Sequence, residues 1–215
     1  MLTLTPRMVR RTLLPASYVA FLIGLLASAW TFFRDRPFDG KQIIVSDLLS
    51  PDDNPHGYAV LAGGIIISAL LLGPAAAIFH RSLENKRPYF VLAGTLGLAV
   101  GIASAIAIGI LAPITHDYTP LHIQLASATF VGVLAGTWCH LLAARAAGSL
   151  IRFQFAALLA VVFLCYGPVE FNNQRLLTSL AFWEWVVYAD CGAALWAVAR
   201  AVEFAGSDTE PGRRL

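Results

Sequence analysis

Long apolar segments alternate with short polar segments along most of the chain. An α-helix needs ~20 mostly apolar residues to cross the hydrocarbon core of a bilayer. Six segments meet this requirement, and the polar residues cluster between them. The pattern therefore predicts an all-α fold, a polytopic bundle of six transmembrane helices at residues 14–33, 57–79, 90–113, 121–144, 153–171 and 181–204. These helices form one membrane domain, residues 1–204, followed by a polar tail, residues 205–215.

The composition agrees with a membrane protein. Hydrophobic residues make up 58% of the chain and charged residues only 13%, whereas a typical soluble domain carries about 25% charged residues. The net charge of +2 and the lack of a basic stripe argue against a nucleic-acid partner. No cofactor is expected. Three cysteines lie inside apolar segments, which indicates buried thiols and not a disulfide framework: Cys139, Cys165 and Cys191.

The orientation follows from the lysine and arginine residues, which are enriched in cytoplasmic loops. With the N-terminus inside, eleven of the fifteen basic residues lie on the cytoplasmic side and four on the outer side. Both termini are therefore expected in the cytoplasm, and the expected location is the plasma (inner) membrane. The first apolar segment follows Arg7, Arg10 and Arg11. It is long enough to span, so we interpret it as a retained helix and not as a cleaved signal peptide.

Small residues recur every three to four positions in the third and fourth predicted helices. The third contains Gly94, Gly97 and Gly101, and the fourth contains Gly132 and Gly136. Such stripes let two helices approach closely in a membrane, where van der Waals contact drives association. We expect them to pack within the bundle, with dimerisation between chains as the alternative.

Polar and ionisable residues gather at the predicted outer face. His122 begins the fourth helix, Glu170 ends the fifth, and Glu184 begins the sixth beside Trp185. Glu184 alone would suit a helix start, and Trp185 would suit an interface anchor. Alternatively, these groups surround a polar pocket in which a histidine and a carboxylate exchange protons. The other candidates for ligand binding at this face are Ser46, Asp47, His116 and Asn173.

Three further residues lie away from this face. Asp190 is about two turns deeper than Glu184, and an acid at that depth is a functional candidate. His80 and His140 lie near cytoplasmic helix ends, where they could face each other across a haem. Snorkelling toward the interface is the simpler explanation for both histidines. A metal site at His116, Asp117 and His122 is not expected, because the spacing matches no standard ligand pattern.

Four features resemble a known family. The first outer loop contains Ile44-Val-Ser46-Asp47, and the third helix is glycine-rich. The fourth helix begins His122-x-x-x-Ala126-x-x-x-Phe130, and the sixth begins Phe182-Trp-Glu184-Trp185. In this order they resemble the six-helix family that includes the damage-regulated autophagy modulators, the Frag proteins of GPI-anchor lipid remodelling and the fungal Sfk proteins. A bacterial six-helix family of unknown function has a similar Ser-Asp-Leu loop.

This resemblance implies a six-helix fold and a role in lipid remodelling or lipid asymmetry, without a catalytic mechanism. The positions that match the family's motifs are Ser46, Asp47, His122, Glu184 and Trp185. The loop departs from the family after Asp47, where it reads Leu-Leu-Ser-Pro-Asp-Asp. The resemblance therefore does not extend to contacts that the family makes through the rest of that loop.

Three functional hypotheses follow. The first is a lipid-handling protein that binds a membrane lipid, with the headgroup in the outer polar pocket and the acyl chains between helices. A histidine beside a carboxylate can bind a phosphate headgroup through charge-assisted hydrogen bonds. The second is an acyl transferase or hydrolase with His122 as base and Asp47 or Glu184 orienting it. The third is a structural subunit with a membrane-protein partner or a second copy of itself.

The orientation can be tested with single cysteines in a cysteine-free background. Asp53→Cys should react with a membrane-impermeant maleimide added to intact cells, because its loop is predicted to lie outside. Asn85→Cys should be protected until the cells are permeabilised. Labelling of Asn85→Cys together with protection of Asp53→Cys would reverse the assigned orientation.

Overall fold

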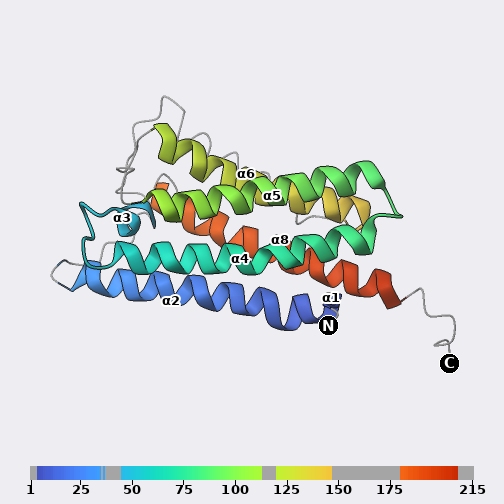
Figure 1. Cartoon of the computed structure of the whole chain (residues 1–215), viewed down its shortest axis with the longest axis horizontal. Helices are drawn as coiled ribbons and strands as arrows, with labels where there is room; N and C mark the ends of the chain where they lie inside the picture. The colour runs from blue at the N-terminus through green and yellow to red at the C-terminus, as the bar shows by residue number, and fades with distance from the viewer. Residues whose placement is uncertain (1–3, 35, 37–44, 113–119, 147–179, 208–215) are drawn as a thin grey trace.

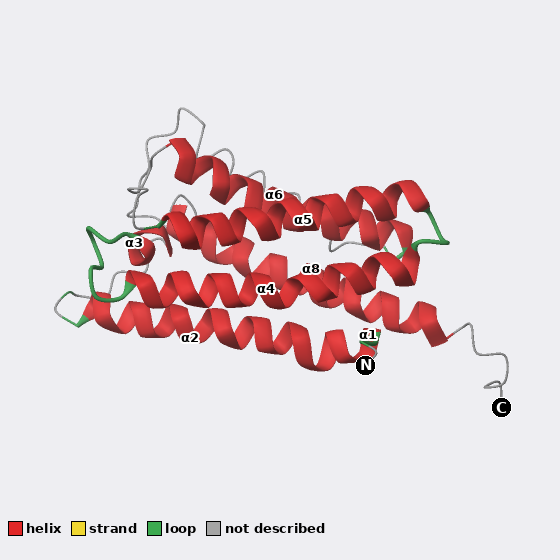
Figure 2. Ribbon diagram, viewed as in Figure 1, coloured by secondary structure: helices red, strands yellow, loops and turns green. Residues whose placement is uncertain are grey.

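The structure is a computed structural model that describes residues 4–34, 36, 45–112, 120–146 and 180–207. In these ranges every regular element is a helix (Figure 2). A short N-terminal helix and a π-helical turn lead into the first long helix. The elements in chain order are α1 (Pro6–Met8), η1 (Val9–Leu13), α2 (Leu14–Phe33), α3 (Val45–Leu49), α4 (Tyr58–Leu83), α5 (Pro88–Leu111), α6 (Pro120–Ala143) and α8 (Leu180–Ser207).

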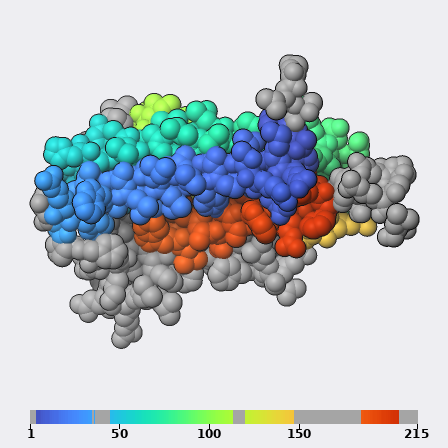
Figure 3. Space-filling view, turned by 90° about the horizontal axis from the view of Figure 1, so that it is seen from below, coloured from blue at the N-terminus to red at the C-terminus, as the bar shows by residue number. Residues whose placement is uncertain are grey.

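The long helices lie side by side in one bundle with two distinct ends (Figure 1). We call one of them the terminal end, because α2 starts there and α8 finishes there. At the same end, Arg87 Nη1 donates to the Leu142 carbonyl oxygen at the end of α6 over 3.3 Å. At the α3 end, the Val45 amide contacts Glu184 near the start of α8. Figure 3 shows α2 on one face of the bundle, flanked by α4 and α8. The N-terminus and the end of α8 therefore lie at the same end.

Five helices of the described part are long and apolar enough to cross a membrane. They confirm five of the six predicted segments, with boundaries shifted by up to four residues. The largest shift extends α4 to Leu83, because that side chain is fully buried in the core at the terminal end. The predicted segment 153–171 lies outside the described residues.

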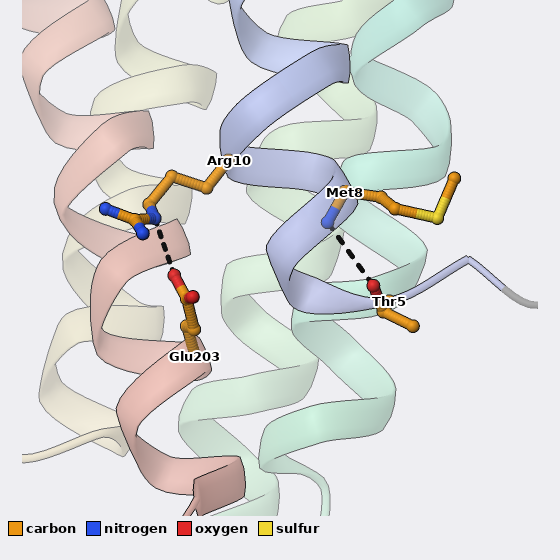
Figure 4. Close-up of polar contacts among 4 residues, drawn as sticks. All are labelled: Thr5, Met8, Arg10 and Glu203. Carbon is orange, nitrogen blue, oxygen red and sulfur yellow. Dashed lines mark hydrogen bonds and ion pairs between the residues drawn. The ribbon is translucent and has the colours of Figure 1, made fainter.

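The first and last helices are joined at the terminal end. Thr5 caps the start of α1, where its hydroxyl accepts a hydrogen bond from the Met8 amide over 3.3 Å. Arg10, in the π-helical turn, forms an ion pair with Glu203 of α8 over 2.5 Å (Figure 4). From the sequence, Arg10 was only one of the basic residues that indicate the orientation in the membrane. In the structure it also connects residues that are 193 positions apart.

The closest helix contact joins α5 and α6 through glycines. The amide nitrogen of Gly101 lies so near Gly132 that an added Cβ would approach it to 2.6 Å, and a Cβ at Gly97 would lie 2.9 Å from the Gly136 Cα. A side chain would therefore push two backbones apart. The expectation that these stripes pack within the bundle is confirmed.

Replacing Gly101 by leucine should destabilise the bundle by about 3 kcal/mol, because overpacking a close backbone contact has no easy relaxation. The melting temperature in detergent micelles measures this loss. Gly63→Leu on α4 is the matched control, since a Cβ there meets nothing within 4 Å. Equal melting temperatures for the two variants would contradict the proposed role of the α5–α6 contact.

Candidate functional site

A buried asparagine holds one end of α3 to the bundle. Asn54 is only 2% exposed. Its Nδ2 donates to Ser28 Oγ (2.8 Å) and to the Leu48 carbonyl oxygen (3.0 Å), and its Oδ1 accepts from Thr31 Oγ1 (3.0 Å). Ser28 Oγ donates in turn to the same Leu48 carbonyl oxygen (3.0 Å). The network satisfies polar groups that would otherwise be costly to bury, and it fixes the C-terminal part of α3 against α2.

Glu184 holds the other end of α3. Its Oε2 accepts a hydrogen bond from the backbone amide of Val45, the first residue of α3, over 2.8 Å. Between the two attachments, the side chains of Val45, Leu48 and Leu49 are buried in an apolar cluster with α2 and α4. A helix of five residues is not stable alone, so these contacts account for its formation.

His122, from the start of α6, meets α3 between these attachments. The ring is 7% exposed, and its Nε2 lies 3.1 Å from Ser46 Oγ. The fixed position of α3 thus brings Ser46 to His122 and Glu184 to Val45. Three elements that are far apart in sequence build one polar cluster, which we call the α3-end cluster: Ser46, His122 and Glu184.

A cavity of about 410 Å³ extends from the α3-end cluster into the bundle. All three residues of the cluster line it, and so do many apolar side chains of α2, α4, α5, α6 and α8. Two tyrosines and a serine pair add polar groups to the lining. They are Tyr18, Tyr188, Ser17 and Ser68, of which the two serine hydroxyls lie 2.8 Å apart. The cavity therefore combines one strongly polar end with a mostly apolar interior.

The structure brings together four of the nine residues predicted for the site. Ser46, His122, Glu184 and Trp185 all line the cavity. Asp47 lies in α3 beside Ser46 but is not among the described lining residues. Asp190 is 5% exposed and also lies outside this lining. The remaining three residues fall outside the described part of the chain: His116, Glu170 and Asn173.

Of the two alternatives for Glu184, the described helix favours a role away from its own helix start. Because α8 begins at Leu180, Glu184 lies beyond the first turn, and the described first turn of α8 contains no acidic residue. Its carboxylate is used on another element, at the Val45 amide.

Sequence reasoning missed the residues that position α3 and the tyrosines that line the cavity. Asn54 sits in a polar loop run, Asp52-Asp-Asn54-Pro-His56, where its burial leaves no signal in the pattern. Its partner Ser28 is one small residue within an apolar segment. Tyr18 and Tyr188 read as ordinary apolar helix positions, so only their place around the cavity distinguishes them.

The two histidines near the terminal end are joined by a threonine. His80 Nδ1 lies 2.9 Å from Thr95 Oγ1, which lies 3.5 Å from His140 Nε2. His140 Nδ1 donates to the Gly136 carbonyl oxygen over 2.9 Å. The prediction that His140 snorkels toward the interface is wrong, because its side chain is fully buried. Its ring packs where a side chain on Gly94 would otherwise stand, so its role here is in helix packing.

No group of three or more histidine, cysteine, aspartate or glutamate residues suited to a metal ion occurs in the part of the chain that the structure describes. No protein family, no curated protein and no solved structure matches the chain. The five long apolar helices of the described part define the class to which the chain belongs, a multi-pass integral membrane protein.

Removing the Glu184 carboxylate should loosen α3. A hydrogen bond to a charged group contributes ~1.5–3 kcal/mol, so Glu184→Ala should speed amide hydrogen exchange over residues 45–49 by about ten- to a hundredfold. Glu184→Gln, which keeps an acceptor oxygen, should show a smaller change. Exchange followed by mass spectrometry in nanodiscs measures both. Wild-type protection in Glu184→Ala would show that the carboxylate does not hold α3.

Proposed function

We propose that this protein binds a membrane lipid or a similar amphiphile inside its helix bundle. The observation that carries the proposal is the cavity itself, whose polar end and apolar interior match the two parts of such a molecule. The headgroup would hydrogen-bond to the α3-end cluster, and an acyl chain would lie among the apolar side chains of the long helices. The function is lipid handling for membrane homeostasis.

The size and lining of the cavity support this proposal. A volume of 410 Å³ falls within the range of about 300–1,000 Å³ that small-molecule sites occupy. Such sites are mostly apolar with a few oriented polar groups. Here the polar groups are held in place by α3, whose two ends are attached to α2 and α8. A rigid polar end suits recognition of a headgroup that enters from the membrane surface.

The orientation proposed from the basic residues places the α3-end cluster at the extracytoplasmic surface. The long helices then run along the membrane normal, and the polar end of the cavity lies at headgroup depth. Polar groups at that depth avoid most of the penalty for burial in hydrocarbon. A lipid of the outer leaflet would thus reach the site with its head and chain already in the right order.

Acyl transfer or hydrolysis is a second candidate, favoured by the contact between His122 Nε2 and Ser46 Oγ over 3.1 Å. A histidine at hydrogen-bond distance can remove the hydroxyl proton of a serine as the oxygen attacks an acyl carbonyl. The acyl group would then be carried by Ser46, and the proton would pass from His122 to the leaving alcohol. In this version Ser46 replaces the acidic residues as the partner of His122.

Filling the cavity should remove the bound lipid. Ala126 lines the cavity one turn below His122, and Ala126→Phe should lower the lipid that copurifies with the protein at least fivefold, as measured by mass spectrometry. Ala103→Phe is the control, because Ala103 is exposed on α5 and is not among the lining residues. Unchanged lipid content in Ala126→Phe would overturn lipid binding in this cavity.

A fluorophosphonate probe separates the binding and enzyme versions in the same preparations. If Ser46 is a nucleophile, the wild-type protein should be labelled covalently, whereas Ser46→Ala and His122→Ala should not. If the site only binds, no variant should be labelled and His122→Ala should weaken lipid retention. The melting temperature of each variant confirms that it is folded.

A further inference from the structure

The long helices line the cavity over only part of their length. On α8 the lining runs from Glu184 to Leu195, and on α6 it runs from His122 to Val133. The two residues of each pair are eleven positions apart, which corresponds to about 16 Å along a helix axis. The lining thus begins at the α3-end cluster and stops inside the bundle, well before α6 and α8 reach the terminal end.

A layer of buried apolar side chains lies directly below the last lining residues. On α2, α4, α5 and α8, the lining residues nearest the terminal end are Ser17, Leu72, Gly101 and Leu195. Three positions further toward the terminal end, which is the same face of each helix, the side chain is at most 2% exposed and belongs to one core cluster. We call these four residues the floor: Leu14, Ala75, Leu98 and Val198.

At the floor and below it, α5 and α6 are in backbone contact. A Cβ at Gly136 would lie 2.7 Å from the Leu98 amide nitrogen, and the ring of His140 fills the space beside Gly94. On α6, Val133 both lines the cavity and belongs to the core cluster of the floor. The described helices therefore close the cavity toward the terminal end, and its polar end lies at the α3-end cluster.

Two hydroxyls beside the floor are bonded within the protein. Ser17 Oγ donates to the Ser68 carbonyl oxygen over 3.0 Å, and the Oγ atoms of the two serines lie 2.8 Å apart. An apolar group can therefore lie against them without breaking a hydrogen bond. Leu72 and Ile102 also line the cavity next to the floor and pack against the same core cluster. This end of the cavity suits the methyl end of an alkyl chain.

The length and the volume of the cavity restrict the chain that it can hold. An extended chain advances about 1.2 Å per bond, so about 12 carbons reach from the α3-end cluster to the floor. The volume of about 410 Å³ lies in the lower part of the range of ~300–1,000 Å³ for drug-sized ligands. A lipid with two long chains is larger than such ligands, so the cavity matches one chain.

We propose that the occupant is a single-chain amphiphile whose chain, of about 12 carbons, ends at the floor, so that the protein selects its ligand by chain length. This inference rests on the proposed lipid binding and specifies its ligand. Lipid tails are as apolar as the side chains that line the cavity, so extra methylene groups gain little by leaving the bilayer. A longer chain overpacks the floor, and a shorter chain leaves a void above it.

The test uses the full chain in nanodiscs and 1-dodecanoylglycerol with a photoreactive diazirine in its acyl chain. Unlabelled saturated 1-acylglycerols, from 1-octanoylglycerol to 1-octadecanoylglycerol, compete for photolabelling at equal mole fractions in the bilayer. The dodecanoyl compound should compete about tenfold better than the two ends of the series, which corresponds to about 1.4 kcal/mol.

Changing the size of Leu72, which packs against the core cluster of the floor, should change the preferred length. Leu72→Trp should move the optimum to 1-decanoylglycerol, and Leu72→Ala should move it to 1-tetradecanoylglycerol. Leu70→Trp and Leu70→Ala are the matched controls and should keep the wild-type optimum, because Leu70 is 58% exposed on the same helix and is not among the described lining residues. The melting temperature confirms that each variant is folded, and either Leu72 variant alone tests the inference.

A flat length profile in the wild type, or an unchanged optimum in a folded Leu72 variant, would overturn the inference while lipid binding stands. Competition by didodecanoylglycerol as strong as that by 1-dodecanoylglycerol would overturn the single chain. Absence of any saturable photolabelling would reject the proposed function itself, and the inference with it.

Discussion

Two polar side chains attach the five residues of α3 to the helices around it, and the geometry of the candidate site depends on them. Asn54 fixes the C-terminal part of α3 to α2, and Glu184 fixes its first amide to α8. Without these contacts the segment has neither the length nor the hydrogen bonds to stay helical. With them, Ser46 is held at His122 and the cavity acquires its polar end. The hydrogen bonds that satisfy these buried polar groups therefore determine where the candidate site lies.

The bundle below α3 is packed unevenly, and this unevenness accounts for the cavity. Helices in a membrane gain little from the hydrophobic effect when they associate, so close contact needs small residues. Glycines supply that contact between α5 and α6 and, at Gly24 and Gly64, between α2 and α4. Where α2 and α6 face α8, larger side chains meet instead: the ring of Tyr188 contacts those of Phe21 and Phe130. The cavity occupies the space between the pairs, with α8 along one side.

Much of the fold could be predicted from the sequence because membrane thickness and helix geometry leave few choices for an apolar segment of 20 residues. The same reasoning found the glycine stripes, whose regular spacing reflects a regular contact. It also selected Ser46, His122 and Glu184, because polar groups at helix ends are few. It could not find Asn54 or the partner of Glu184. Those contacts join residues distant in sequence, and the positions of α2, α3 and α8 that create them leave no periodic signal.

The ion pair between Arg10 and Glu203 has a consequence for how the site comes into being. A chain enters the membrane from its N-terminus as it is synthesised, so η1 and α2 are made well before the α8 residue with which Arg10 pairs. The cavity needs both helices, since α2 contributes Tyr18 and α8 contributes Glu184 and Tyr188. The full lining of the cavity is thus present only once α8 has joined α2. Until α8 is in place, the side of the cavity that α8 lines is open to the surrounding lipid.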